Sequence, residues 1–469
     1  MPADISFYKY FVLVHPVQTG AVAYISGRAD LLACFFILLA FIFYIGFEQK
    51  AYRALSLITF VLAILSKEIA IVFPLALIIY DIIYKKASFL SGVLKRYSGY
   101  LAVVIVYIGL RLMVFDFTPA KETVVPGGDI IARIMTMWRI LTEYLCLLIY
   151  PSNLHMEREI PVVASAFSGE PVLAVAGFIC ALFLTVTAYK KSRTVFFGIA
   201  WFLLFLIPVS NIVPINALMA EHWLYIPSIG FFLAVSALLT RLTDKKAVYI
   251  FVMTLFIIVA LLYGFKSAAR NKDWKNDLSI YSSTLKFSPK KARIYYNLGT
   301  AYGARGLLEN AVKYYNLAIE KGMKESVVYA NLAITYTELG RYKEAEDAFC
   351  SAIALNPDNP FAHNGLGGLY EKMNLKEKAM DEYKKVLISH PDFYEANVNI
   401  GALYGEKGEH RKALYYFKKA FSVKKDKASY YNLGYAYYKS GDREKAKETW
   451  EESLRKYPHD NPAEKVLKK

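Results

Sequence analysis

The sequence predicts an all-α protein of two parts, a polytopic helical membrane domain of about eight spans followed by a solenoid of paired helices. Apolar residues make up 56% of the 469 residues and charged residues 20%, which excludes disordered, collagen-like and disulfide-scaffold classes. The long apolar runs precede residue 270, and most of the charge follows it. A pattern of period 34 then runs through residues 292–458, which indicates stacked copies of one helical unit.

Eight apolar runs account for the membrane domain, because about 20 apolar residues cross the ~30 Å of hydrocarbon as a helix. The predicted spans are 31–47, 54–66, 69–84, 99–115, 171–189, 195–212, 223–240 and 247–265. A ninth run, 134–150, has Arg139, Thr142 and Glu143 inside its apolar pattern. Polar residues at those places favour an amphipathic interfacial or re-entrant helix over a span.

The basic residues of the short loops predict the orientation. Twelve of them fall in the loops 48–53, 85–98, 190–194 and 241–246, and such loops face the cytoplasm. The region 266–469 is therefore expected outside the cytoplasm. None of the seventeen asparagines begins an N-x-Ser/Thr sequon, which favours a bacterial inner membrane with a periplasmic repeat domain. An endoplasmic reticulum membrane with lumenal repeats is the eukaryotic equivalent.

The formal charge of +16 does not by itself indicate nucleic acid, because basic residues of a polytopic protein fill cytoplasmic loops and face anionic lipid, so we expect no nucleic-acid partner. The four cysteines are scattered without metal or disulfide spacing, and we expect no metal and no cofactor.

Ionisable residues gather at the predicted outer ends of the spans. Arg28 and Asp30 precede one span, and Lys67 and Glu68 separate two others. Interfacial anchoring with local ion pairs is the structural interpretation of each residue taken alone. For the set, an outward-opening polar cavity is the functional interpretation, in which a cation holds a phosphate and a carboxylate acts as base.

The period of 34 has recurring small and aromatic positions in five blocks, which begin at 292, 326, 360, 394 and 427. Position eight is small, at Gly299, Ala333, Gly367, Gly401 and Gly434. Position twenty-four is a ring, at Tyr315, Phe349, Tyr383, Phe417 and Trp450. Small residues let paired helices approach closely and rings fill the space between them, which is the tetratricopeptide pattern.

The repeats set the expected domain limits and a possible peptide site. We expect a membrane domain at 1–269, a partial repeat or linker at 270–291, five repeats at 292–460 and a capping helix at 461–469. Asparagines recur near the first helix of four repeats, at Asn297, Asn331, Asn364 and Asn432. They are candidates for binding a peptide backbone in the groove of the solenoid, and a purely structural role is the alternative.

Five motifs resemble the transmembrane and tetratricopeptide repeat protein O-mannosyltransferases of the glycosyltransferase C superfamily. The motifs are HPVQTGAVAYISGRADLLA at 15–33, LSKEIAIVFPLALIIYD at 65–81, LRLMVF at 110–115, WFLLFLIPVSNIVP at 201–214 and AEHWLYIPSIGF at 220–231. Their order and the change to repeats match the family over nearly the whole chain.

The resemblance implies a transferase that moves a sugar from a polyprenyl-phosphate donor to a protein hydroxyl, with the repeats presenting the acceptor. For the donor phosphate we predict Arg28, Lys67 and Arg111. The candidate bases are Asp30, Glu68 and Glu221, and His15 and His222 are supporting polar residues.

Family members also carry earlier spans and a first outer loop with an acidic pair regarded as catalytic, and we expect this chain to lack them. Two motif positions differ as well: the family's usual Glu is Gly20 here, and its usual Arg after Ala-Glu is His222. Two further hypotheses therefore remain open. One is a catalytically inactive membrane-anchored scaffold for protein–protein interaction, and the other is a polysaccharide ligase or polymerase with repeats.

Overall fold

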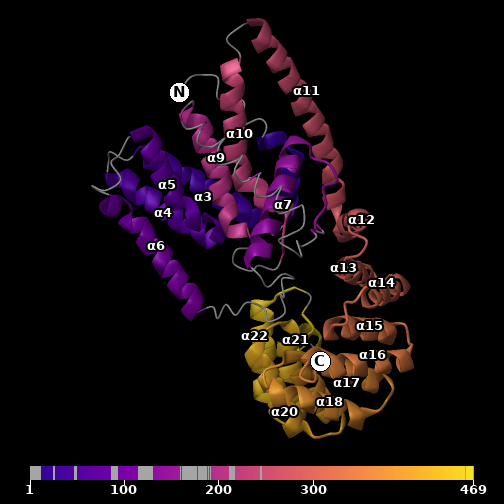
Figure 1. Ribbon diagram of the computed structural model, residues 1–469. Helices are drawn as coiled ribbons and strands as arrows, with labels where there is room; N and C mark the ends of the chain where they lie inside the picture. Colours follow the sequence, from indigo (N-terminus) through magenta and orange to yellow (C-terminus); the bar gives the residue numbers. More distant parts are fainter. Residues whose placement is uncertain are drawn as a thin grey trace. The chain divides into compact units, whose positions relative to one another are not determined.

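A computed structural model shows the chain as a set of helices in two compact units (Figure 1). It describes residues 12–24, 27–46, 50–85, 93–114, 130–158, 160, 192–210, 217–242, 246–459 and 461–467, with the single positions 177, 187 and 190. These residues form helices and turns and contain no strand, so the all-α fold class is confirmed. We call Met1–Pro289 the membrane unit and Lys290–Lys469 the repeat unit.

The helices of the membrane unit follow the apolar runs of the sequence. The longer ones are α3 (Arg28–Ile45), α4 (Lys50–Ser66), α5 (Phe73–Tyr80), α6 (Val93–Met113), α7 (Ile130–Ile149), α9 (Arg193–Leu206), α10 (Tyr225–Leu239) and α11 (Lys246–Asn271). Short helical turns precede or continue them: η2 (Pro16–Gln18), α2 (Thr19–Ala23), η4 (Glu68–Val72), η5 (Asp81–Lys85), η6 (Ile207–Val209), η7 (Glu221–Leu224) and η8 (Thr240–Leu242).

Four stretches have the length and apolar composition of a membrane span: Arg28–Ile45, Arg96–Met113, Glu221–Leu239 and Lys246–Asn271. The predicted span 171–189 lies outside the described residues, apart from two isolated positions. The total of eight spans therefore stays a prediction. The segment predicted as an interfacial helix forms α7, whose Tyr144 and Leu148 are buried in an apolar cluster with Phe202 and Phe232.

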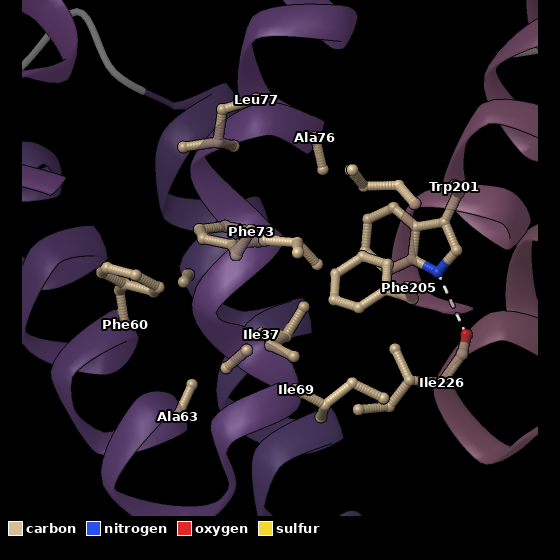
Figure 2. Close-up of a cluster of buried hydrophobic side chains, with 14 of the residues drawn as sticks. Ile37, Phe60, Ala63, Ile69, Phe73, Ala76, Leu77, Trp201, Phe205 and Ile226 are labelled. Atoms are coloured by element: carbon tan, nitrogen blue, oxygen red, sulfur yellow. Dashed lines mark hydrogen bonds between the residues drawn. The ribbon is translucent and has the colours of Figure 1, made fainter. Parts of the chain in front are cut away.

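One apolar cluster ties the early helices to the later ones (Figure 2). Ile37 of α3, Phe60 of α4 and Phe73 of α5 are fully buried. They meet Phe205 and Trp201 of α9, whose indole Nε1 donates a hydrogen bond to the Ile226 carbonyl of α10 at 3.1 Å. Aromatic rings thus fill the space between these helices.

Helices α9 and α10 meet at two glycines. A Cβ on Gly198 would lie 2.5 Å from the Gly230 carbonyl oxygen, and a Cβ on Gly230 would lie 2.4 Å from the Gly198 carbonyl oxygen. Since real Cβ atoms do not approach backbone so closely, these positions accept only glycine at this helix separation. Small residues have the same use where membrane helices pack backbone against backbone.

The membrane unit also includes the short helices after its last long one. These are η9 (Asp273–Lys275) and α12 (Asp277–Phe287). The Ser288 hydroxyl donates to the Glu157 carbonyl at 2.7 Å, and Phe287 stacks on His155 with ring centroids 5.1 Å apart. The segment after α11 is therefore held against the loop that follows α7.

The repeat unit is a series of helical pairs. The pairs are α13 (Ala292–Gly303) with α14 (Leu308–Glu320), α15 (Ser326–Glu338) with α16 (Tyr342–Leu355), α17 (Pro360–Lys372) with α18 (Lys376–Ser389), α19 (Tyr394–Glu406) with α20 (His410–Val423) and α21 (Lys427–Lys439) with α22 (Arg443–Lys456). The short α23 (Ala463–Leu467) follows, with Ala463 buried beside Trp450.

The small and aromatic positions of the 34-residue pattern meet inside each pair, as the sequence predicts. A Cβ on Gly367 would lie 2.5 Å from a ring carbon of Tyr383, and a Cβ on Gly434 would lie 2.3 Å from the Trp450 indole nitrogen. The turn inside each pair contains one residue of positive φ, at Gly306, Gly340, Asn374, Gly408 and Gly441. Glycine and asparagine are the residues that adopt this conformation at least cost.

Candidate functional site

A buried ion pair joins α3 to the segment after α4. Asp30 lies in the first turn of α3 and is 1% exposed. Both of its carboxylate oxygens accept from the Lys67 Nζ at 2.6 Å. Gly27 brings this turn against α2, because a Cβ there would lie 2.3 Å from the Ala21 carbonyl oxygen. The pair is thus enclosed, and each charge compensates the other.

The other predicted phosphate ligands lie at the surface. Arg111, near the end of α6, donates from Nη1 to the Tyr107 hydroxyl at 2.6 Å and lies 3.8 Å from the Glu68 carboxylate. Glu68 is 58% exposed, and Arg28 is exposed at the first position of α3. Among the predicted carboxylates, Glu68 is therefore the one that a substrate can reach directly.

Glu221 forms the centre of a second buried group. Its Oε1 accepts from the His155 backbone N–H at 2.7 Å and from Arg158 Nη2 at 2.9 Å. Arg270 Nη2 lies 4.0 Å from Oε2, and Arg270 Nη1 donates to Asp273 at 2.8 Å. The side chains of Glu221 and Arg270 are each 6% exposed. Three segments far apart in the chain therefore meet at one carboxylate.

The two predicted supporting histidines occupy different surroundings. His15 is 1% exposed, its Nδ1 accepts from the Val17 N–H at 3.2 Å, and its Nε2 lies 3.2 Å from the Leu148 carbonyl, to which it donates. Burial lowers the pKa of His15 to about 4, so the ring is neutral and structural. His222 is partly buried beside Trp223, close enough to Lys67 to be influenced by its charge.

The structure thus places the predicted site residues in separate ion pairs. It joins Asp30 with Lys67 and Glu68 with Arg111, and it places Glu221 apart from both pairs. Helix η7 connects the two regions, because it carries Glu221 and, next to it, His222, which is close to Lys67.

Arg158 and Arg270 were missed as site residues. Arg158 is a basic residue in a predicted outer loop, where basic residues are otherwise avoided, and that signal could have identified it. Arg270 stands among the many basic residues after the last span, so no such signal marks it. Within the described ranges no cluster of His, Cys, Asp and Glu has metal-binding geometry.

Two of the four candidate asparagines are bonded to a neighbouring repeat. The Asn331 amide donates to the Tyr296 hydroxyl at 3.0 Å, and the Asn364 oxygen accepts from the Asn399 amide at 3.2 Å. These bonds join the first helices of consecutive repeats. Asn297, Asn331, Asn364 and Asn432 all remain partly exposed, and their contact with a peptide stays a prediction.

Comparison with protein families identifies the repeats. Models described as tetratricopeptide repeat match residues 292–320, 394–427 and 428–460, and one described as TPR repeat matches 335–374. Among solved structures, that of MamA resembles 36% of this chain and 92% of its own, at 22% identity and a TM-score of 0.31.

Curated relatives cover part of both units. The protein O-mannosyl-transferase F38B6.6 of Caenorhabditis elegans is 28% identical over 64% of this chain and 44% of its own length. The human protein O-mannosyl-transferase TMTC3 is 26% identical over 64% of this chain and 37% of its length. The chain thus spans less than half the length of these relatives. The motifs and the comparisons agree that it resembles the transmembrane and tetratricopeptide repeat protein O-mannosyl-transferases.

Proposed function

We propose that this membrane protein transfers a sugar from a polyprenyl-phosphate donor to a hydroxyl of a protein that its repeats hold. The observation that carries the proposal is the charged end of the membrane unit, where Asp30 and Lys67 form a buried pair beside the exposed Glu68 and the partly exposed Arg111. The names of the relatives supply the reaction class. The tetratricopeptide repeats supply a protein-binding surface.

The exposure of each residue decides the role that we propose for it. Arg28 and Arg111 are accessible cations that can bind the donor phosphate through the two-donor edge of a guanidinium. Lys67 is compensated by Asp30 and would add its remaining N–H donor. Glu68 is the accessible carboxylate that would take the proton from the acceptor hydroxyl as the new glycosidic bond forms. The bond between the sugar and the phosphate breaks in the same step, and the polyprenyl phosphate leaves while bound by the basic residues.

A transfer assay tests this assignment. Membranes containing the full chain are given a polyprenyl-phosphate sugar with radiolabelled mannose, and incorporation into protein is counted. We expect Glu68→Gln to lower the rate at least 100-fold, since general-base catalysis contributes about 10²- to 10⁴-fold. The control is Glu309→Gln on the repeats, which removes a 73% exposed carboxylate. Full turnover by Glu68→Gln would exclude Glu68 as the base.

The inactive scaffold is the second candidate, and the site itself gives a reason for it. Asp30 and Glu221 are engaged with cations and buried, as structural carboxylates are. Replacing Arg28 and Lys67 with alanine separates the two functions. An enzyme would lose transfer while its repeats still bind their partners. A scaffold, which has no transfer to lose, would keep both its partners and its cellular phenotype.

The repeats are proposed to lie outside the cytoplasm, in the periplasm or the lumen of the endoplasmic reticulum. Supporting this orientation, the helix ends near Lys50, Lys85, Arg193 and Lys246 carry the basic residues of the predicted cytoplasmic loops. Cys350 on α16 is an exposed free thiol. We expect a membrane-impermeant maleimide to label it in spheroplasts or sealed lumen-out vesicles, and Cys350→Ser to remove that label. Labelling only after detergent would reverse the orientation.

A further inference from the structure

The group around Glu221 has more buried donors than it has acceptors. Four buried N–H groups find no hydrogen-bond acceptor among the described residues: Nε of Arg158, Nε and Nη2 of Arg270, and Nε1 of Trp274. A buried donor without an acceptor costs about 1–3 kcal/mol, and more when it is charged. The set therefore favours an acceptor that the described side chains do not supply.

Glu221 cannot be that acceptor for all of them. Its Oε1 already accepts two hydrogen bonds, and its Oε2 lies 4.0 Å from Arg270 Nη2, beyond hydrogen-bond distance. Among the described residues the buried charges are also unequal, because the guanidinium groups of Arg158 and Arg270 share the Glu221 carboxylate. Asp273, which pairs with Arg270, is 35% exposed and so partly screened. The surplus of buried positive charge favours an anion over a neutral acceptor.

The edge of the Arg270 guanidinium matches a phosphoryl group. Nε and Nη2 form one edge of the Arg270 guanidinium, and two parallel N–H groups on such an edge match two oxygens of a phosphate. The Trp274 ring lies beside this guanidinium, with 5.6 Å between its centroid and the Arg270 Cζ. Arg158 approaches the same carboxylate from the other oxygen.

The depth of the group matches that of lipid phosphates. Helix α11 has 26 residues, which is about 39 Å at 1.5 Å per residue, whereas the hydrocarbon is ~30 Å thick. Arg270 is the next-to-last residue of this helix. Its guanidinium therefore lies at the end of the span, at the level where headgroup phosphates are found.

We propose that Arg158, Arg270 and Trp274 form a phosphoryl-binding site next to Glu221, distinct from the pair of Asp30 and Lys67. The phosphoryl group is supplied by a lipid headgroup or by free phosphate. The site does not depend on the transferase activity, because its evidence is the set of buried donors.

Phosphate binding to the purified full chain tests the site. The protein is prepared in a phosphate-free maltoside detergent and titrated at constant ionic strength with inorganic phosphate and, separately, with dodecyl phosphate. Calorimetry and the shift in Tm report binding. We expect saturable binding of at least one ligand. Binding of dodecyl phosphate at least tenfold tighter identifies a lipid source, and equal affinities identify free phosphate.

Two conservative variants and one matched control keep the test decisive. Arg270→Lys keeps the charge but removes the two-donor edge, and Trp274→Phe removes one donor while keeping a ring. We expect the phosphate ligand to bind at least tenfold more weakly to Arg270→Lys and about threefold more weakly to Trp274→Phe. The control is Trp450→Phe in the repeat unit, which should bind as the unaltered chain does. Absence of saturable binding, or unchanged affinity in both variants, would overturn the proposal.

Discussion

The contacts inside the repeat unit join residues that are close in the sequence, whereas those inside the membrane unit join residues that are far apart. In the repeat unit, Gly367 meets Tyr383 sixteen positions later, and the same contact recurs in other repeats. In the membrane unit, Asp30 pairs with Lys67 and Glu221 pairs with Arg158, across 37 and 63 positions. A periodic sequence therefore specifies the repeat unit pair by pair, whereas the membrane unit depends on contacts between distant segments, these ion pairs and the apolar cluster among them.

Breaking the buried pair should give the largest effect. Lys67→Met leaves the Asp30 carboxylate buried without its cation, and we expect the free energy of unfolding to fall by about 3–5 kcal/mol. Thermal unfolding of the full chain in detergent measures it. Asp30→Asn combined with Lys67→Met should recover most of the loss. If the double variant is no more stable than the single one, the pair is not the cause.

The second-largest effect is expected from acid, which should lower the stability of the membrane unit. Burial lowers the pKa of His155 to about 4, and the charges of Arg158 and Arg270 act in the same direction. The unfolded chain binds a proton near pH 6.5, while the folded ring stays neutral, so stability is present above pH 6.5 and is lost as pH falls toward 4. The loss is about 3 kcal/mol at most.

Unfolding midpoints from pH 7 to pH 4 measure this dependence. His155→Gln should reduce the slope of the profile in this range, and part of the remaining slope would come from His15, whose pKa is also lowered to about 4. A profile that His155→Gln leaves unchanged would contradict the assignment to His155.

Two adjacent glycines in α17 give the smallest and sharpest comparison. Gly367→Ala places a methyl against the Tyr383 ring and should cost about 1–3 kcal/mol. At Gly368 the nearest atom is the Tyr383 hydroxyl, 3.8 Å away, so Gly368→Ala should stabilise by up to about 1 kcal/mol. Circular dichroism of the full chain during heating reports both. Equal effects at the two positions would refute the packing argument.

What the sequence could predict follows the same division. The 34-residue period was enough to place Gly434 against Trp450, because every repeat carries the same small and aromatic positions. The apolar runs of the membrane domain likewise placed Arg28, Lys67 and Arg111 at the ends of helices. They could not separate the enclosed Lys67 from the exposed Arg28, because exposure depends on how helices pack.

The group around Glu221 was beyond such reasoning for another reason. Arg158, Glu221 and Arg270 lie in three different segments, and no repeat or spacing in the sequence links them. Their contact depends on how η7, the loop after α7 and the end of α11 meet.

The glycine contact between α9 and α10 has a mechanical consequence. With the Gly198 and Gly230 backbones in direct contact, no flexible side chain separates the two helices there to absorb a displacement. Helix η7 continues directly into α10. We therefore expect a displacement of the segment that carries Glu221 and His222 to move α10 and, through this contact, α9 with it.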